Sequence, residues 1–77
     1  MLTLAETPPG AVVRVIEIMG GRGMRLRLMR MGLNLGDLVK VLSSGPLRGP
    51  VYLENLSTGV KLALGRGVAS KVLVEPQ

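Results

Sequence analysis

The chain has 77 residues and carries ten Lys and Arg against five Asp and Glu, a formal net charge of +5 at pH 7. It contains no His, no Cys and a single aromatic residue, Tyr52. This composition excludes disulfides and thiolate metal sites, leaves no histidine for acid-base catalysis, and requires a core of aliphatic and methionine side chains.

The length fits one domain, and we expect residues 1–77 to fold as a single unit. No apolar run approaches the roughly 20 residues that a helix needs to span a bilayer. The N-terminus has neither the basic start nor the long apolar run of a signal peptide. These features lead us to expect a cytoplasmic protein.

The first predicted strand covers residues 11–18, which are rich in β-branched side chains. It follows a turn that contains two prolines and a glycine. Simple alternation would put Val13 and Val15 on one face and Ile16 and Ile18 on the other. We therefore expect a strand that is apolar on both faces, with one face against the core and the other under a helix or a partner.

A short helix is predicted for residues 22–31, after a pair of glycines that ends the first strand. Met24, Leu28 and Met31 recur at helical spacing and form one stripe that would pack onto the barrel. Gly32 is expected to end the helix, because glycine readily takes the left-handed conformation found there.

The second half of the chain predicts four further strands, separated by turns rich in glycine and proline. Their ranges are residues 37–43, 51–54, 60–64 and 71–74. The two middle ranges form a hairpin, and a single helical turn precedes the last strand. Alternation points these side chains toward the core: Val51, Leu53, Val60, Leu62, Leu64, Val72 and Val74. The sequence thus predicts a mainly β fold, a small five-stranded barrel with one inserted short α-helix.

The outer side of the predicted helix is the first candidate site for a partner. Leu26 and Met29 lie away from the core stripe, given a rotation of about 100° per residue. Arginines flank them, namely Arg22, Arg25 and Arg30. An apolar centre with a charged rim is common in protein interfaces. The alternative is that the arginines are only solvated and the apolar pair lies under the N-terminal segment or the proline-flanked loop.

That loop, residues 44–50, is the second candidate site. Leu47 and Arg48 lie at its tip, between two prolines. Prolines restrict the backbone, which lowers the entropy that is lost when the tip binds a partner.

Metal binding and catalysis find little support in the sequence. Ferrous iron sites favour His and carboxylate ligands, and the five acidic residues are scattered along the chain. Methionines at helical spacing usually fill gaps in packing. The serines have no base beside them that could activate a nucleophile. We therefore predict no catalytic residue, no metal site within the chain and no cofactor.

A small basic barrel that binds nucleic acid is the main alternative function. Barrels that hold single strands stack bases on aromatic rings, and one tyrosine does not form such a platform. Arginines could still contact phosphates, so nucleic acid is disfavoured on composition while the alternative stays open. A self-associating regulatory module is a third interpretation, because exposed strand edges could pair subunits.

The order of these motifs resembles the FeoA family. The family pattern of a helix end, a turn and a valine strand is matched by Arg27, Leu28, Met31, Gly32, Leu33, Gly36, Val39 and Val41. Its proline-flanked loop and closing strands are matched by Pro46, Gly49, Pro50, Val51, Leu62, Ala63, Leu64, Ala69, Val72 and Val74. The start is similar at Leu2, Leu4, Pro9, Gly10 and Val15. The family often carries proline where this chain has Asn34-Leu35, and charged helix formers where it has Gly65-Arg66-Gly67.

The resemblance implies an SH3-like barrel, a module that also occurs in metal-dependent repressors. It further implies a non-enzymatic accessory protein of ferrous iron uptake. The implied partner is the cytoplasmic part of a FeoB-type ferrous iron transporter, and contact with the membrane would come only through that transporter. Homo-oligomerisation stays possible on these grounds.

Overall fold

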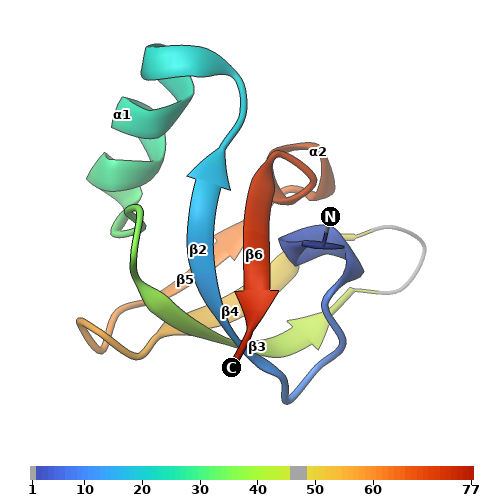
Figure 1. The fold of residues 1–77 in the computed structure, drawn as a ribbon. Coiled ribbons are helices and arrows are strands. Elements are labelled where there is room, and N and C mark those ends of the chain that lie inside the picture. Colours follow the sequence, from blue (N-terminus) through green and yellow to red (C-terminus); the bar gives the residue numbers. More distant parts are fainter. Residues whose placement is uncertain (1, 46–48) are drawn as a thin grey trace.

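The computed structural model describes residues 2–45 and 49–77. Its elements in chain order are β1 (Leu2–Thr3), the 3-10 helix η1 (Leu4–Glu6), β2 (Val12–Ile18), α1 (Gly21–Met31), β3 (Leu38–Ser44), β4 (Val51–Asn55), β5 (Lys61–Leu64), α2 (Arg66–Ala69) and β6 (Val72–Pro76). The strands form one antiparallel sheet in the order β1-β6-β2-β3-β4-β5. Figure 1 shows β2 and β6 running side by side across β3, β4 and β5, with α1 at one corner and α2 beside the N-terminal segment at another.

The mainly β, SH3-like fold with one inserted helix is confirmed, but the sheet has six strands rather than five. The additional strand, β1, pairs with β6 through Leu2 opposite Val74 and Thr3 opposite Leu73. Two residues are too few to show alternation, so this strand left no pattern in the sequence. The chain then turns through η1, where the Thr3 amide donates to Glu6 Oε1 at 3.0 Å, and buries Leu4 completely.

Aliphatic side chains fill the interior, as the composition requires. The buried set comprises Leu4, Val13, Val15, Ile18, Leu28, Leu33, Val39, Val41, Val51, Leu53, Leu64, Ala69, Val72 and Val74. The inward positions predicted for β4 and β6 are all in this set. Val60 does not belong to the buried set. It lies just before β5, outside the strand whose alternation was used to place it, and it is exposed, so its predicted inward position is wrong.

The first strand corrects one prediction through a β-bulge. The register between β2 and β6 shifts between Val15 and Glu17, so that β2 contains one residue more than its partner. Beyond the bulge the alternation is reversed. Ile18 is therefore buried on the same side as Val13 and Val15, while Ile16 is exposed.

The predicted helix is present, and its end explains a second correction. Leu28 is buried and Met24 packs against the core, but Met31 is exposed and does not belong to the predicted stripe. Gly32 takes φ of 102°, and its amide donates to Met29 O while the Leu33 amide donates to Leu28 O. This hydrogen-bond pattern is a Schellman motif, which turns the chain back so that Leu33, rather than Met31, is buried beside Leu28.

Within residues 2–45 and 49–77, none of the helices has the length and apolar character that a bilayer span requires.

Candidate docking surface

A groove lies between α1 and the turn that follows it, and we call it the α1 groove. Its volume is about 220 Å³, and it is lined by Arg22, Arg25, Leu26, Met29, Asn34 and Leu35. The apolar members are open to solvent, with exposed fractions of 37% for Leu26, 47% for Met29 and 41% for Leu35. The structure thus brings together four of the residues that the sequence predicted for partner binding.

The remaining predicted site residues lie elsewhere. Arg30 is exposed on α1, but the described lining of the groove does not include it. Leu47 and Arg48 fall outside the described residues. Sequence reasoning missed Asn34 and Leu35. The only signal for them was the aliphatic side chain of Leu35 within a turn.

The alternative in which the N-terminal segment covers the apolar pair is wrong. That segment pairs with β6 through β1, and η1 packs against β6 and α2. It is therefore held at another corner of the fold from α1 (Figure 1). Leu26 and Met29 are left on the surface of the described structure.

Asn55 holds the two walls of the α1 groove together. Its side chain is completely buried, and its Nδ2 donates at 2.8 Å both to Gly32 O and to Asp37 Oδ2. The same Asp37 oxygen accepts from the Asn34 amide at 2.8 Å. One side chain from the end of β4 thus fixes the end of α1 and the turn after it.

The turn itself is closed by local and sheet contacts. Asn34 Oδ1 accepts from the Leu35 amide at 2.9 Å, and the Gly36 amide donates to Val15 O at 2.8 Å. These bonds hold the backbone of the turn so that Leu35 lies beside α1. The Leu35 side chain itself is not packed in the core.

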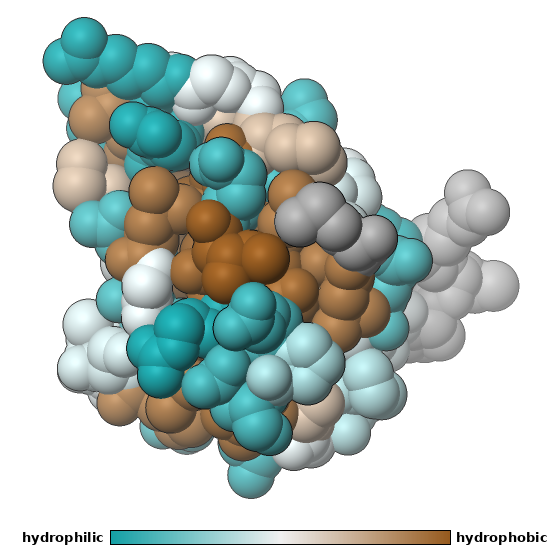
Figure 2. Space-filling view, viewed as in Figure 1, coloured by the Kyte–Doolittle hydropathy of each residue, from teal (hydrophilic) through white to brown (hydrophobic). Residues whose placement is uncertain are grey.

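The charge on α1 has a single sign. The helix carries Arg22, Arg25, Arg27 and Arg30 and no acidic residue. Arg22 lies in the first turn, where the helix dipole disfavours a cation, so its position does not serve helix stability. Figure 2 shows hydrophilic side chains over α1 and a hydrophobic area beside them, over β2 and β6.

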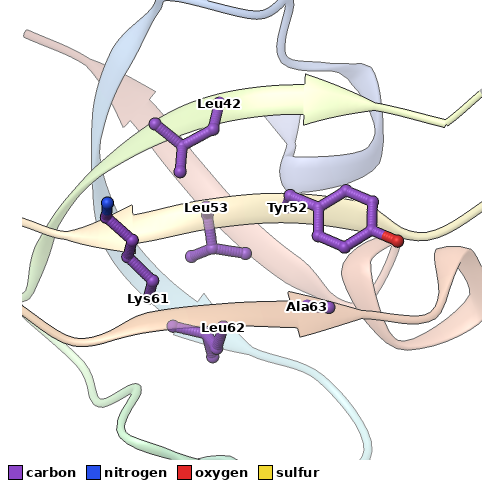
Figure 3. Close-up of a pocket in the computed structure, with 6 residues that line it drawn as sticks. All are labelled: Leu42, Tyr52, Leu53, Lys61, Leu62 and Ala63. Carbon is purple, nitrogen blue, oxygen red and sulfur yellow. The ribbon is translucent and has the colours of Figure 1, made fainter.

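A second hollow lies on the outer side of β3, β4 and β5, and we call it the sheet groove. It has a volume of about 330 Å³ and is lined by Leu42, Tyr52, Leu53, Lys61, Leu62 and Ala63. Figure 3 shows Lys61 and the Tyr52 ring at opposite ends with leucines between them. Sequence reasoning did not predict this groove, because its residues come from three strands that are brought together only by the fold.

The part of the chain that the structure describes contains no cluster of three or more His, Cys, Asp or Glu side chains that could hold a metal ion. Three of the five acidic residues accept hydrogen bonds instead. Glu6 accepts from the Thr3 amide, Glu17 from the Ile18 amide, and Asp37 from Asn34 and Asn55.

The chain matches the family model described as "FeoA domain" over residues 2–76. It is 39% identical over 75 residues to the "Putative Fe(2+) transport protein A" of Methanocaldococcus jannaschii, covering 97% of this chain and 87% of that protein. Among solved structures it is similar to an iron uptake regulatory protein (FeoA), with 36% identity and a TM-score of 0.85 over 99% of this chain and 96% of the other.

A manganese-dependent transcriptional repressor in complex with manganese shares the fold. The TM-score is 0.86 at 21% identity, and the match covers 99% of this chain and 36% of the repressor. The expectation that the same module occurs within metal-dependent repressors is therefore confirmed at the level of fold.

Proposed function

The chain belongs to the FeoA family, and we propose on that basis that it is a non-enzymatic, cytoplasmic accessory protein of ferrous iron uptake that docks on the cytoplasmic part of a FeoB-type transporter. Two relatives support the link to iron, since their names refer to Fe(2+) transport and to iron uptake.

The observation that carries the proposal is the α1 groove. Three exposed apolar side chains, Leu26, Met29 and Leu35, lie beside two arginines at one solvent-open depression. Interfaces combine an apolar centre that excludes water with a polar rim, and arginine is enriched in them. The helix that carries this surface is fixed to the barrel by Leu28 and Asn55, so little order is lost on docking.

A non-enzymatic role agrees with the chemistry of the side chains. The chain lacks His and Cys, the residues that most often act as general base or as activated nucleophile. The described lining of the α1 groove holds no pair of nucleophile and base, and in the sheet groove Tyr52 and Lys61 lie at opposite ends (Figure 3). On this proposal, the protein acts through contact with another macromolecule.

Nucleic-acid binding is the second candidate, because four arginines lie on one helix. The only aromatic side chain of the chain, Tyr52, lines the sheet groove and not the α1 groove. A single strand on α1 would thus have no ring for stacking there. This separation of charge from the aromatic ring favours protein docking over nucleic acid.

The test of the proposal is binding to the soluble cytoplasmic part of the cognate transporter. We expect saturable binding by isothermal titration calorimetry, with and without a GTP analogue on the transporter. The affinity should fall only a few-fold between low and moderate salt, whereas binding to nucleic acid through several phosphate contacts falls by orders of magnitude. Absence of binding in both nucleotide states would reject the proposal.

A further inference from the structure

We infer that the α1 groove receives an acidic segment of its partner, one in which a single apolar side chain is flanked by carboxylates. This inference rests on the proposed function and names the chemistry of the segment that docks. It is carried by the shape of the groove, by the sign of its rim and by the position of its arginines.

The shape sets the apolar part of the segment. A volume of about 220 Å³ between Leu26, Met29 and Leu35 has room for one large aliphatic or aromatic side chain. The walls come from two elements that Asn55 holds together, so the hollow exists before the partner binds. A preformed hollow favours an anchoring side chain over contact between two flat surfaces.

The rim sets the charge of the segment. Arg22 and Arg25 line the groove one helical turn apart, and no acidic side chain is among its described lining residues. The nearby Asp37 carboxylate already accepts from the Asn34 amide and from Asn55 Nδ2. Arginine binds a carboxylate through two parallel hydrogen bonds, which fixes both distance and orientation.

The distribution of charge favours a protein segment over a lipid surface or a nucleic acid. An anionic membrane attracts every nearby cation to a similar degree, and so does a phosphate backbone. Only two of the four arginines of α1 border the apolar hollow. A protein segment in the groove would therefore contact Arg22 and Arg25 but not Arg27 and Arg30, whereas a membrane or a duplex would attract all four.

The experiment compares two double variants of the full chain, R22Q/R25Q and R27Q/R30Q. Each removes two positive charges from the exposed surface of α1, and Gln is a good helix former, so stability should change little. Against the soluble part of the transporter, R22Q/R25Q should bind at least about tenfold more weakly, because charge-assisted hydrogen bonds are lost. R27Q/R30Q should bind within about threefold of the wild type, as expected for exposed charges that do not line the groove.

The apolar half of the inference has its own matched pair. Leu35→Ser removes a groove side chain that is 41% exposed, and Leu56→Ser removes one that is 42% exposed and is not among the described residues lining either groove. Leu35→Ser should weaken binding by about tenfold, through loss of buried apolar area. Leu56→Ser should leave the affinity unchanged.

The outcomes separate the inference from the proposed function. Equal weakening by the two arginine pairs, with wild-type binding intact, overturns the inference and leaves docking in place. No binding by the wild type rejects the proposed function itself. Two probes complete the test: vesicles with roughly 30 mol% phosphatidylglycerol and a short duplex DNA. Tight binding of the wild type to either, lost equally in both arginine variants, also overturns the inference, and melting curves of all four variants confirm folding.

Discussion

The two grooves of this protein differ in what surrounds their apolar residues. The sheet groove is the larger, at about 330 Å³ against about 220 Å³, but Lys61 is the single cation among its described lining residues. The α1 groove is smaller and has two arginines on its rim. Volume alone therefore does not identify a docking surface, because complementary charge gives specificity to apolar contact.

Their structural support differs as well. The sheet groove lies over the β3–β4–β5 ladders, and its Leu42 is exposed because it follows the buried Val41 in the alternation of β3. The α1 groove depends on a few hydrogen bonds centred on Asn55. Substitutions can thus alter the α1 groove while the barrel stays folded.

The largest expected effect comes from a matched pair of charge insertions, one in each groove. Leu26→Asp should weaken binding to the transporter's soluble part by about 100-fold, because it places a carboxylate in the apolar centre of the proposed interface. Leu42→Asp introduces the same charge at a leucine of similar exposure in the sheet groove and should leave the affinity unchanged. Titration calorimetry measures both. The reverse pattern would assign docking to the sheet groove.

The second prediction concerns the support of the α1 groove. Asn55→Ala removes the donations to Gly32 O and Asp37 Oδ2 and the acceptor of the Ser57 amide, and it leaves buried polar groups without partners. The free energy of unfolding should fall by about 3 kcal/mol, as measured by urea denaturation. Asn34→Ala, at an exposed turn position, should lower it by less than about 1 kcal/mol. A loss below about 1 kcal/mol in Asn55→Ala would show that other contacts fix the groove.

The third prediction tests the reversal that ends α1. Gly32 has φ of 102°, and a Cβ added there would lie 3.1 Å from Val60 Cγ1. Gly32→Ala should reduce the free energy of unfolding by about 2 kcal/mol, through strain in the left-handed conformation together with this close contact. Gly59→Ala has a similar φ of 83° in open space and should lose only about 1 kcal/mol. Equal losses of unfolding free energy in the two variants would show that the contact with Val60 adds nothing to the cost of Gly32→Ala.

The smallest expected effect is a stabilisation. Gly23 lies within α1, and nothing is within 4 Å of a Cβ added at that position. Gly23→Ala should increase the free energy of unfolding by about 0.5–1 kcal/mol, because alanine loses less backbone entropy in a helix. A thermal melt monitored by circular dichroism detects the increase. Affinity for the transporter should stay the same, and a loss of affinity would mean that flexibility of α1 is needed for docking.

Sequence reasoning succeeded where the signal is periodic and local. The helix and the five predicted strands follow from the spacing of aliphatic residues, and Gly32 marks the end of α1 as expected. The same periodicity failed at Ile18, because a bulge depends on the register of the partner strand. It also failed at Met31, because the backbone reversal at Gly32 buries Leu33 in its place.

The candidate site was predictable only in part, for a related reason. Arg22, Arg25, Leu26 and Met29 share one helix, so their helical spacing groups them in the sequence. Leu35 joins them only because its turn is held by Asn55 and Val15, which are distant from it along the chain. The sheet groove combines three strands and is a property of the assembled fold alone.

The most direct test of the central claim is a methyl NMR titration of the protein with the soluble cytoplasmic part of the proposed FeoB-type partner. Docking through the α1 groove predicts that the methyl signals of Leu26, Met29 and Leu35 shift or broaden, while those of Leu42 and Leu62 stay unchanged. Perturbation confined to Leu42 and Leu62, or no perturbation at saturating transporter, would contradict the account.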